Sequence, residues 1–414
     1  MSALDKIRAA KAASTTLAQA NTGLKNAGLA AISKALVANA AKIIAANAED
    51  LARGVETGLS VGLQDRLRLD DKRIKALADA VELIIALPDP IGDVKRGMTL
   101  ANGLKLTQVA VPFGVVGAIY EARPNVTVDI SALALKAGNA SVLRGGSAAE
   151  NTNLVLVSVI QEALESVGLP RESVVTVDDF GRAGAVEMMQ ARGLVDVLIP
   201  RGSASLIKAV VEESKVPVIE TGDGVVHIFI DETARLDWAT EIVFNSKVQR
   251  PSVCNALETL LIHRAALDRI GPSVLQKLHE AGVTIHGDSE IVAKFDFAVA
   301  ASEEDWAAEY YSLDLAVKVV GNLDEALEHI ARYSTHHTES IITDDVSNAE
   351  RFLSSIDSAV VMVNAATRFT DGGEFGFGAE VGISTQKLHA RGPMGLAELT
   401  STKWLVRGEG QTRA

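Results

Sequence analysis

The chain has 414 residues, too many for one ordinary domain, so two or three domains are expected. Hydrophobic residues make up 48% of it and charged residues 22%, which is typical of a globular protein with a large core. A formal net charge of −13 and an aromatic content of 4% argue against nucleic acid as a partner, because phosphate binding needs clustered Lys and Arg and base stacking needs aromatic side chains.

Helices are predicted for most of the first hundred residues. Apolar residues recur at helical spacing between Leu29 and Ile43, which indicates one amphipathic helix. A second long helix is predicted to begin after Asp70, a good N-cap residue, and to stop before Pro88.

The segment from Gly97 to Gly114 has a different pattern. Its alternating apolar and polar residues, with Asn102 and Gly103 at the turn, predict a β-hairpin. The sequence offers no evident core partner for this hairpin, so we expect it to pair with another subunit.

Short apolar strands alternate with helices from residue 115 onward, which is the pattern of a doubly wound parallel sheet. The strands expected in this first sheet are 115–120, 141–144, 173–177, 195–199 and 216–220. A second series follows Cys254, with strands expected at 257–263, 283–286, 315–320, 340–344 and 358–364. Two open sheets in series indicate two domains, and a long glycine-rich loop is predicted from Thr370 to Leu396.

Cys254 is the first candidate for chemistry, because it is the only cysteine in the chain. A single cysteine is more often an inert buried side chain than a nucleophile. The local sequence favours the nucleophile, since Lys247 and Arg250 precede the thiol and cationic neighbours stabilise a thiolate. Pro251 also predicts an irregular backbone just ahead of it.

The sequence also bears on the compartment. One cysteine cannot form an intramolecular disulfide, which fits a reducing environment. No apolar run reaches the roughly 18 residues that cross a bilayer. We therefore expect a cytoplasmic protein without a membrane partner.

Polar residues follow several strands of the first predicted sheet. Asn125 comes after the first strand, where its amide can either stabilise an oxyanion or cap a helix. Arg144 and Ser147 follow the second strand and suit a ribose or a phosphate. Gly202 and Ser203 begin a helix, which is a ready anion site, and Glu220 ends the fifth strand. Each of these residues alone is common in the turns that follow strands. Together they predict a nucleotide site that lacks the standard glycine fingerprint.

The histidines give no sign of a metal site. His336, His337 and His389 lack metal-ligand spacing with the cysteine or with a further histidine. We expect solvated or capping roles for them and no bound metal.

These features, in this order, resemble the aldehyde dehydrogenase superfamily over nearly the whole chain. That superfamily carries an asparagine after the first strand, a basic residue after the second, a Gly-Ser helix start, a glutamate-glycine motif and then the nucleophilic cysteine. The matching positions here are Asn125, Arg144, Gly202, Ser203, Glu220, Gly222 and Cys254. The stretch EYYSLDLAVKVV resembles the segment whose glutamate binds the nicotinamide ribose, which carries that role to Glu309.

Within the superfamily the chain is most similar to the branch that reduces L-glutamyl 5-phosphate to L-glutamate 5-semialdehyde with NADPH, the second step of proline biosynthesis from glutamate. The stretches that carry this similarity are YEARPNVTVDISALALKAGNA, LRGGSAAENTN, QRPSVCNALETLL, FGAEVGISTQKLHARGPMGL and ELTSTKW. Most of the superfamily has E-L-G-G-K where this chain has ETGDG, and its oxidising members use that glutamate with water. A reductase that starts from an acyl phosphate needs no such water, so the resemblance carries no general-base role to Glu220.

The resemblance implies an α/β, aldehyde-dehydrogenase-like fold of two doubly wound domains plus a β-hairpin oligomerisation element. Residues 1–96 and 115–223 would form the Rossmann-type NADP-binding domain, 97–114 the hairpin and 224–369 the catalytic domain. Residues 370–414 would form the glycine-rich loop and a C-terminal segment that returns to the cofactor or oligomerisation region. The implied partners are further copies of the chain, in a dimer or tetramer, and glutamate 5-kinase, which makes the substrate.

The resemblance also implies a mechanism. Cys254 would attack the γ-acyl carbon to form a thioester, and Asn125 would stabilise the oxyanion. Arg250 is expected to steer the departing phosphate, and Asn364 and Arg368 to bind the α-amino and α-carboxylate groups. The residues expected to hold NADPH are Arg144, Ser147, Gly202, Ser203, Glu220, Gly222 and Glu309.

Two alternatives stay open at the level of sequence. One is an NAD(P)-dependent aldehyde dehydrogenase that oxidises an aldehyde to an acid on the same fold, and the altered glutamate motif speaks against it. The other is a non-catalytic protein on the same fold, and the presence of Cys254 and Asn125 speaks against that.

Overall fold

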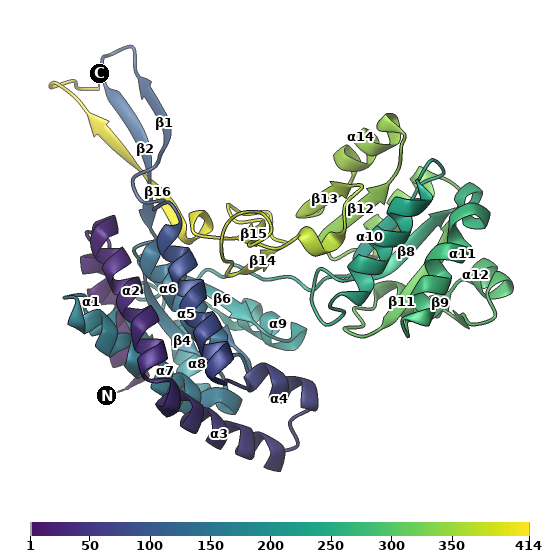
Figure 1. Cartoon of the computed structure of the whole chain (residues 1–414). Helices are drawn as coiled ribbons and strands as arrows, with labels where there is room; N and C mark the ends of the chain where they lie inside the picture. Colours follow the sequence, from purple (N-terminus) through teal and green to yellow (C-terminus); the bar gives the residue numbers. More distant parts are fainter. Residues whose placement is uncertain (1, 414) are drawn as a thin grey trace. The chain divides into compact units, whose positions relative to one another are not determined.

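The computed structural model describes residues 2–413, which divide into two compact units. Unit 1 takes its described residues from Met1–Thr221, Gly376–Gly382 and Met394–Ala414. Unit 2 consists of Gly222–Phe375 and Ile383–Pro393. Each unit contains its own parallel sheet, and Figure 1 shows both with their helices.

Unit 1 begins with five helices before its first strand. The helices of unit 1 are α1 (Ala3–Leu17), α2 (Thr22–Ala38), α3 (Ala40–Glu56), α4 (Val61–Leu67), α5 (Asp71–Ala86), α6 (Pro124–Lys136), α7 (Glu150–Ser166), α8 (Gly181–Gln190) and α9 (Ala204–Glu213). Its strands are β1 (Val94–Thr99), β2 (Lys105–Pro112), β3 (Val115–Tyr120), β4 (Ala140–Arg144), β5 (Val174–Thr176), β6 (Val197–Arg201) and β16 (Thr400–Arg407). As predicted, Asp70 caps α5, and its side chain accepts the N–H of Arg73.

The parallel sheet of unit 1 has the strand order β5-β4-β3-β6. Two crossovers, through α6 and α7, run from β3 to β5 in one direction, and the crossover through α8 returns to β6 in the other. Because such crossovers are right-handed, α6 and α7 cover one face and α8 covers the other, where it contacts α1. The sheet is therefore doubly wound, and its polar strand ends gather at the carboxyl edge.

The single amphipathic helix predicted across residues 29–43 is wrong, because the structure has two helices there, α2 and α3. The break between them has a local cause. Asn39 adopts φ −103° and ψ 15°, and its side-chain amide donates to the carbonyl of Ala35 one turn back. The two helices meet at 68°. No single described helix is long and apolar enough to cross a bilayer, although this bent pair passes that test by length and composition taken together.

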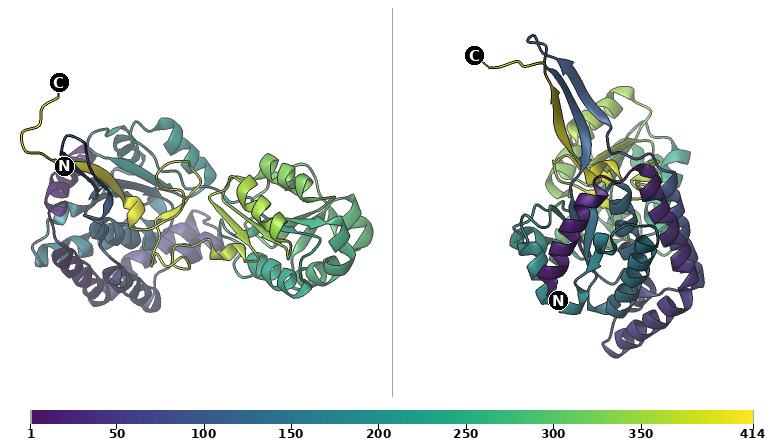
Figure 2. Two further views of the ribbon diagram at one scale, coloured as in Figure 1. Left: turned by 90° about the horizontal axis from the view of Figure 1, so that it is seen from above. Right: turned by 90° about the vertical axis from the view of Figure 1, so that its left-hand side faces the viewer.

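The predicted hairpin is present as β1 and β2, which pair antiparallel. The hairpin has a partner within the chain, because β16 pairs antiparallel with β2 and completes a three-stranded sheet. Figures 1 and 2 show this sheet standing away from the helices of unit 1. Several apolar side chains on it are exposed, namely Val94, Met98, Trp404 and Val406.

The prediction of a fifth strand in the first sheet, at residues 216–220, is wrong. The segment makes one isolated bridge, in which Leu198 donates to the carbonyl of Pro217 and Ile219 donates to the carbonyl of Leu198. Pro217 has no N–H to extend a ladder, so pairing does not continue.

Unit 2 is built on a seven-stranded parallel sheet with the order β10-β9-β11-β8-β7-β12-β13. Its strands are β7 (Val226–Ile230), β8 (Leu257–His263), β9 (Thr284–Gly287), β10 (Val299–Ala300), β11 (Asp314–Val320), β12 (Thr338–Ile342) and β13 (Val360–Val363). Its helices are α10 (Leu236–Val248), α11 (Arg264–Glu280), α12 (Ser289–Lys294), α13 (Leu323–Tyr333) and α14 (Val346–Ser355). The sequence analysis placed the start of this sheet after Cys254 and therefore missed β7.

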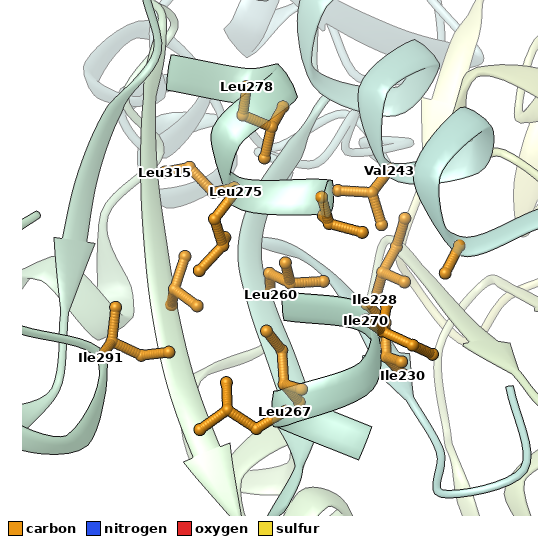
Figure 3. Close-up of a cluster of buried hydrophobic side chains, with 14 of the residues drawn as sticks. Ile228, Ile230, Val243, Leu260, Leu267, Ile270, Leu275, Leu278, Ile291 and Leu315 are labelled. Carbon is orange, nitrogen blue, oxygen red and sulfur yellow. The ribbon is translucent and has the colours of Figure 1, made fainter. Parts of the chain in front are cut away.

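The two faces of the unit 2 sheet have separate cores. By the same handedness rule, α10, α11 and α12 cover one face and α13 and α14 cover the other. Figure 3 shows the first core, in which Leu260 of β8 packs among Val243 of α10 and Leu275 of α11. β7 and β8 are buried on both faces, as is usual for central strands of a parallel sheet.

The glycine-rich segment after Thr370, predicted as a loop, contains two short strands. They are β14 (Gly382–Ser384) and β15 (Gly392–Met394), and they form a two-stranded sheet.

Candidate active site

Cys254 lies half-buried in the turn between α10 and β8. Because β8 is parallel to its neighbours, this turn stands at the amino edge of the unit 2 sheet. The loops before β7, β11 and β12 stand at the same edge, and they contain Gly224, Glu309 and Thr335 respectively. The structure thus brings four predicted residues to one edge, namely Gly222, Arg250, Cys254 and Glu309.

Gly224 packs directly against the backbone of Cys254. A Cβ on Gly224 would overlap the carbonyl oxygen of Cys254, so only glycine fits. Thr335 holds this strand of chain in place, since its hydroxyl donates to the carbonyl of Asp223 at 2.6 Å and accepts the N–H of Val225 at 3.0 Å. The position of the thiol therefore depends on residues from three loops.

Glu309 is tied to the same loop. Its carboxylate accepts the N–H of Gly224 at 2.9 Å. Burial raises the pKa of Glu309 to about 7, against hydrogen bonds from the Tyr311 side chain and Gly224 that lower it. Tyr311 adopts a positive φ of 56°, and burial, together with the charges of Glu309, Asp223 and Cys254, raises its own pKa.

Arg250 precedes Cys254 by four residues in the same loop, and the charges of both act on Arg368. Burial and the charge of Arg250 lower the pKa of Arg368, whereas the charge of Cys254 raises it. The Nε of Arg368 donates to the side chain of Gln249 at 2.8 Å, and Arg250 itself is exposed. A thiolate near two guanidinium groups is stabilised, and an anionic substrate group is attracted to the same place.

Asn364 does not join this group. It follows β13, at the carboxyl edge of the sheet, and both ends of its amide bond the backbone of Thr343 at 2.9 Å. It adopts a positive φ of 56° and lines a cavity of about 330 Å³ with Asp237, Trp238 and Glu241. Its contacts are those of a residue that fixes the turn after β12.

His337 differs from the solvated or capping role expected for it. Its side chain is fully buried, its Nδ1 lies 2.8 Å from the hydroxyl of Thr338, and burial lowers its pKa to about 4. The neighbouring Thr338 hydroxyl donates to Thr370 at 3.0 Å. No group of three or more His, Cys, Asp or Glu side chains within residues 2–413 is arranged to hold a metal ion.

In unit 1, Asn125 lies exposed in the first turn of α6, after β3. Its amide nitrogen donates to Asp129 at 3.2 Å, which leaves one N–H of the amide for another acceptor. Burial raises the pKa of Asp129 to about 6, although the Asn125 bond and the charge of Arg201 lower it. Asp129 was missed by the sequence analysis, and its spacing of four residues from Asn125 on one helix is the signal that could have found it.

Arg144 is the last residue of β4, and Ser147 follows it after two glycines. The backbone turns at Gly146 with φ 76°, and the exposed Ser147 accepts a bond from Arg53 on its carbonyl at 2.6 Å. Beside them, Asp178 accepts the N–H of Gly145 at 2.6 Å. Burial raises the pKa of Asp178 to about 6, against this hydrogen bond and the charge of Arg144. Asp178 follows β5 and was also missed.

Gly202 and Ser203 follow β6, where Ser203 caps α9 and accepts the N–H of Leu206. The backbone N–H of Ser203 donates to Glu121 at 3.1 Å, and a Cβ on Gly202 would come within 2.7 Å of that carboxylate. An anion, the carboxylate of Glu121, thus already binds at this helix start. The sequence analysis passed over Glu121 although it stands within the quoted stretch YEARPN.

Glu220 and Gly222 lie on either side of the division between the units. Glu220 is half-buried at the end of unit 1. Gly222 belongs to unit 2, where its N–H donates to the carbonyl of Ile383 at 3.1 Å. A Cβ on Gly222 would overlap Thr385, so this position also requires glycine.

Comparisons with known proteins give consistent results. A family model described as the aldehyde dehydrogenase family matches residues 3–293. The gamma-glutamyl phosphate reductase of Leifsonia xyli is 64% identical over 410 residues, covering 99% of this chain and 97% of that protein. A crystal structure of gamma-glutamyl phosphate reductase from Thermotoga maritima is 45% identical, with a TM-score of 0.98 over 100% of both chains. An acetylating aldehyde dehydrogenase from Geobacillus thermoglucosidasius, 19% identical with a TM-score of 0.71 over 100% of this chain and 97% of that one, shares the fold.

Proposed function

The chain belongs to the aldehyde dehydrogenase family, and we propose that it reduces L-glutamyl 5-phosphate to L-glutamate 5-semialdehyde and phosphate with NADPH. The observation that carries this proposal is the similarity, over nearly the full length, to proteins named gamma-glutamyl phosphate reductase. The family implies a nicotinamide cofactor, and the choice of NADPH is part of the proposal.

Cys254 is the proposed nucleophile. Its thiolate attacks the γ-acyl carbon, a carbon–sulfur bond forms, and the carbon–oxygen bond to phosphate breaks, which leaves a thioester and inorganic phosphate. The charges of Arg250 and Arg368 support this role in two ways, because they favour the thiolate and attract the phosphate group. Arg368 has a second proposed role toward the α-carboxylate of the substrate.

The oxyanion that develops during attack needs donors. We assign this role to the side-chain amide of Asn125 and the backbone N–H of Cys254, where one such donor is worth about 2.7–4 kcal/mol. The bond from Asn125 to Asp129 supports the assignment, because it fixes the amide with a second N–H to spare. Asn364 stands at the opposite, carboxyl edge of the unit 2 sheet, where its amide bonds the backbone of Thr343, and we leave it out of the substrate site.

The groups of unit 1 fit a phosphorylated dinucleotide. The buried Nε of Arg144 has no hydrogen-bond partner within the described residues, and the nearby Ser147 is exposed. We propose that these two side chains bind the 2′-phosphate or its ribose, which is the basis for NADPH over NADH. The remaining proposed contacts are Gly202, Ser203, Glu220, Gly222 and Glu309. When bound, the nicotinamide supplies the hydride that reduces the thioester.

Ser203 and Glu309 would each have to exchange a partner. The N–H of Ser203 now binds the carboxylate of Glu121, and a cofactor phosphate at this helix start would replace that carboxylate. Glu309, proposed to accept hydroxyl groups of the nicotinamide ribose, now accepts the N–H of Gly224.

The partners are also proposals. The three-stranded sheet β1-β2-β16, with exposed Met98 and Trp404, supports its use as an oligomerisation element in a dimer or tetramer. Contact with glutamate 5-kinase would shorten the path of a reactive acyl phosphate. A catalytic thiol needs a reducing compartment, which supports the cytoplasm.

The test runs the reaction backwards, with glutamate 5-semialdehyde, inorganic phosphate and NADP⁺, and follows the absorbance of NADPH. We expect NADPH formation that depends on phosphate and disappears in Cys254→Ala. Formation without phosphate would mean that water takes the acyl group, as in an aldehyde dehydrogenase that makes an acid. No formation by the folded wild type would contradict the reductase and favour a non-catalytic protein.

A further inference from the structure

A buried ion pair joins the two ends of the loop that carries Cys254. Lys247 is in the last turn of α10, Glu258 is near the start of β8, and their side chains meet at 2.6 Å. Both side chains are 0% exposed. The eight residues between α10 and β8, Gln249–Ala256, include the thiol and Arg250. The pair therefore closes the loop at its base.

A gain in folding stability does not explain why this position has a buried ion pair. Two charges lose their hydration on burial, and a well-packed apolar pair of similar volume commonly stabilises a protein as well or better. Burial accordingly raises the pKa of Glu258 to about 7 and lowers the pKa of Lys247. What an ion pair adds over an apolar pair is a fixed direction and distance between two points of the chain.

The pair also contacts the segment that carries Glu309. The ammonium group of Lys247 lies 5.8 Å from the centre of the Tyr310 ring, and the Tyr310 hydroxyl donates to Asp305 at 2.7 Å. The charges of Glu309 and Glu258 act on one another. Lys247 is thus placed where it can fix two of the loops at this edge of the sheet.

Two further bonds hold the end of the loop that leads into β8. Asn255 donates to the carbonyl of Thr370 at 2.8 Å, and its own carbonyl accepts from Thr367 at 2.8 Å. These bonds tie the loop to the segment that carries Arg368. The loop that carries the thiol is thus held by the ion pair across its two ends and by these bonds to the Arg368 segment.

We propose that Lys247 and Glu258 are positioning residues, whose ion pair holds the Cys254 thiol close to Arg250 and Arg368. The inference rests on the proposed role of Cys254 as the nucleophile. If the pair is lost, the loop relaxes and the thiol moves away from the guanidinium groups. A displacement of about 1 Å at a reacting atom can cost on the order of a hundredfold in rate.

The experiment uses the fact that Cys254 is the only cysteine, so every alkylation reports on it. Alkylation rates are measured with anionic iodoacetate and with neutral iodoacetamide, and their ratio reports the positive charge at the thiol independently of its exposure. The variants are Glu258→Gln, which keeps an oxygen acceptor for Lys247, and the double variant Lys247→Met with Glu258→Leu, which leaves no buried charge unpaired. The matched control is Lys25→Met with Asp89→Leu, which removes a buried ion pair of equal 2.6 Å length in unit 1.

We expect the iodoacetate-to-iodoacetamide ratio to fall about tenfold in the double variant, less in Glu258→Gln, and not at all in the control. The kcat of the reductase falls with the ratio. A wild-type ratio in the double variant would overturn the proposal, and so would an equal fall in the control. Should the double variant fail to fold, a wild-type ratio in Glu258→Gln overturns it instead. Failure of the proposed function is distinguishable, because a wild type without reductase activity still has a measurable alkylation ratio.

Discussion

In unit 1 the candidate residues lie at or beyond the carboxyl ends of the parallel strands, whereas in unit 2 the residues around the Cys254 loop precede the strands. Asn125 and Ser203 come after β3 and β6, and Arg144 ends β4, so all three stand at the carboxyl edge, where open α/β sheets usually bind ligands. Cys254, Glu309 and Gly224 come before β8, β11 and β7 and stand at the amino edge. The difference teaches that the rule placing ligands at the carboxyl edge of a parallel sheet locates the candidate residues of unit 1 but does not locate the thiol of unit 2.

The largest expected effect is at the amino edge of unit 2. Cys254→Ser replaces the thiol by a hydroxyl of similar shape and far lower acidity, so we expect kcat to fall about a thousandfold or more. The steady-state rate of the reverse reaction measures it. A Cys254→Ser enzyme with wild-type activity would mean that the thiol at the amino edge of unit 2 is not the nucleophile.

Asn125 tests the carboxyl edge of unit 1. Asn125→Ala removes the proposed oxyanion donor, and we expect kcat to fall about a hundredfold to a thousandfold with little change in the KM for NADPH. Asp129→Asn is the matched variant, because it keeps a hydrogen-bond acceptor for Asn125. A rise in KM with kcat unchanged would mean that Asn125 only helps to bind the cofactor.

Asp178, beside Arg144, gives a prediction about pH. Burial raises its folded-state pKa to about 6, so the folded protein keeps this proton where the unfolded chain has lost it. Stability contributed by the protonated group is therefore lost as pH rises from about 4 to about 6, by about 3 kcal/mol relative to Asp178→Asn. Urea unfolding of both proteins across this range measures the difference.

Asp5 is the control for the sign. Hydrogen bonds from Ser2 lower the pKa of Asp5, so the wild type should gain stability over Asp5→Asn as pH rises through that group's titration. A change of the same sign at both positions would contradict the assignment of the Asp178 shift to burial.

The smallest effect on activity is expected at the carboxyl edge of unit 2. Asn364→Gly tolerates the positive φ but loses two bonds to Thr343, so we expect a loss of about 1–3 kcal/mol in stability and a change in kcat of less than about twofold. Thermal unfolding and the reverse assay measure the two quantities. A large loss of kcat would restore Asn364 to the substrate site and break the contrast between the two edges.

Local patterns carried much of the fold. The apolar run VVGAIY predicted β3, the mainly apolar run Leu257–His263 predicted β8, and the Asp70 cap predicted the start of α5, because burial and capping are decided by a few adjacent residues. The break at Asn39 and the interruption at Pro217 were missed, since in both cases a single side chain outweighed the apolar periodicity around it.

The site was harder to predict from local pattern. The residues that fix the thiol loop are distant in sequence, as Gly224 and Glu309 are 85 positions apart and Val225 and Thr335 are 110 apart. These residues lie close together because the strands have the order β11-β8-β7-β12. Local sequence patterns do not predict that order. Cys254 was predicted as the nucleophile because it is the only cysteine and has cationic neighbours in sequence. Its position at the amino edge of the unit 2 sheet could be seen only in the fold.

The most direct test of the central claim, that the thiol at the amino edge of unit 2 carries the acyl group, is a mass measurement on the peptide that contains Cys254. The enzyme is mixed with glutamate 5-semialdehyde and NADP⁺ without phosphate, quenched in acid and digested. The account predicts a γ-glutamyl adduct on Cys254 that disappears when phosphate is added before the quench. NADPH formation with no adduct on Cys254, under conditions where a thioester survives, would contradict it.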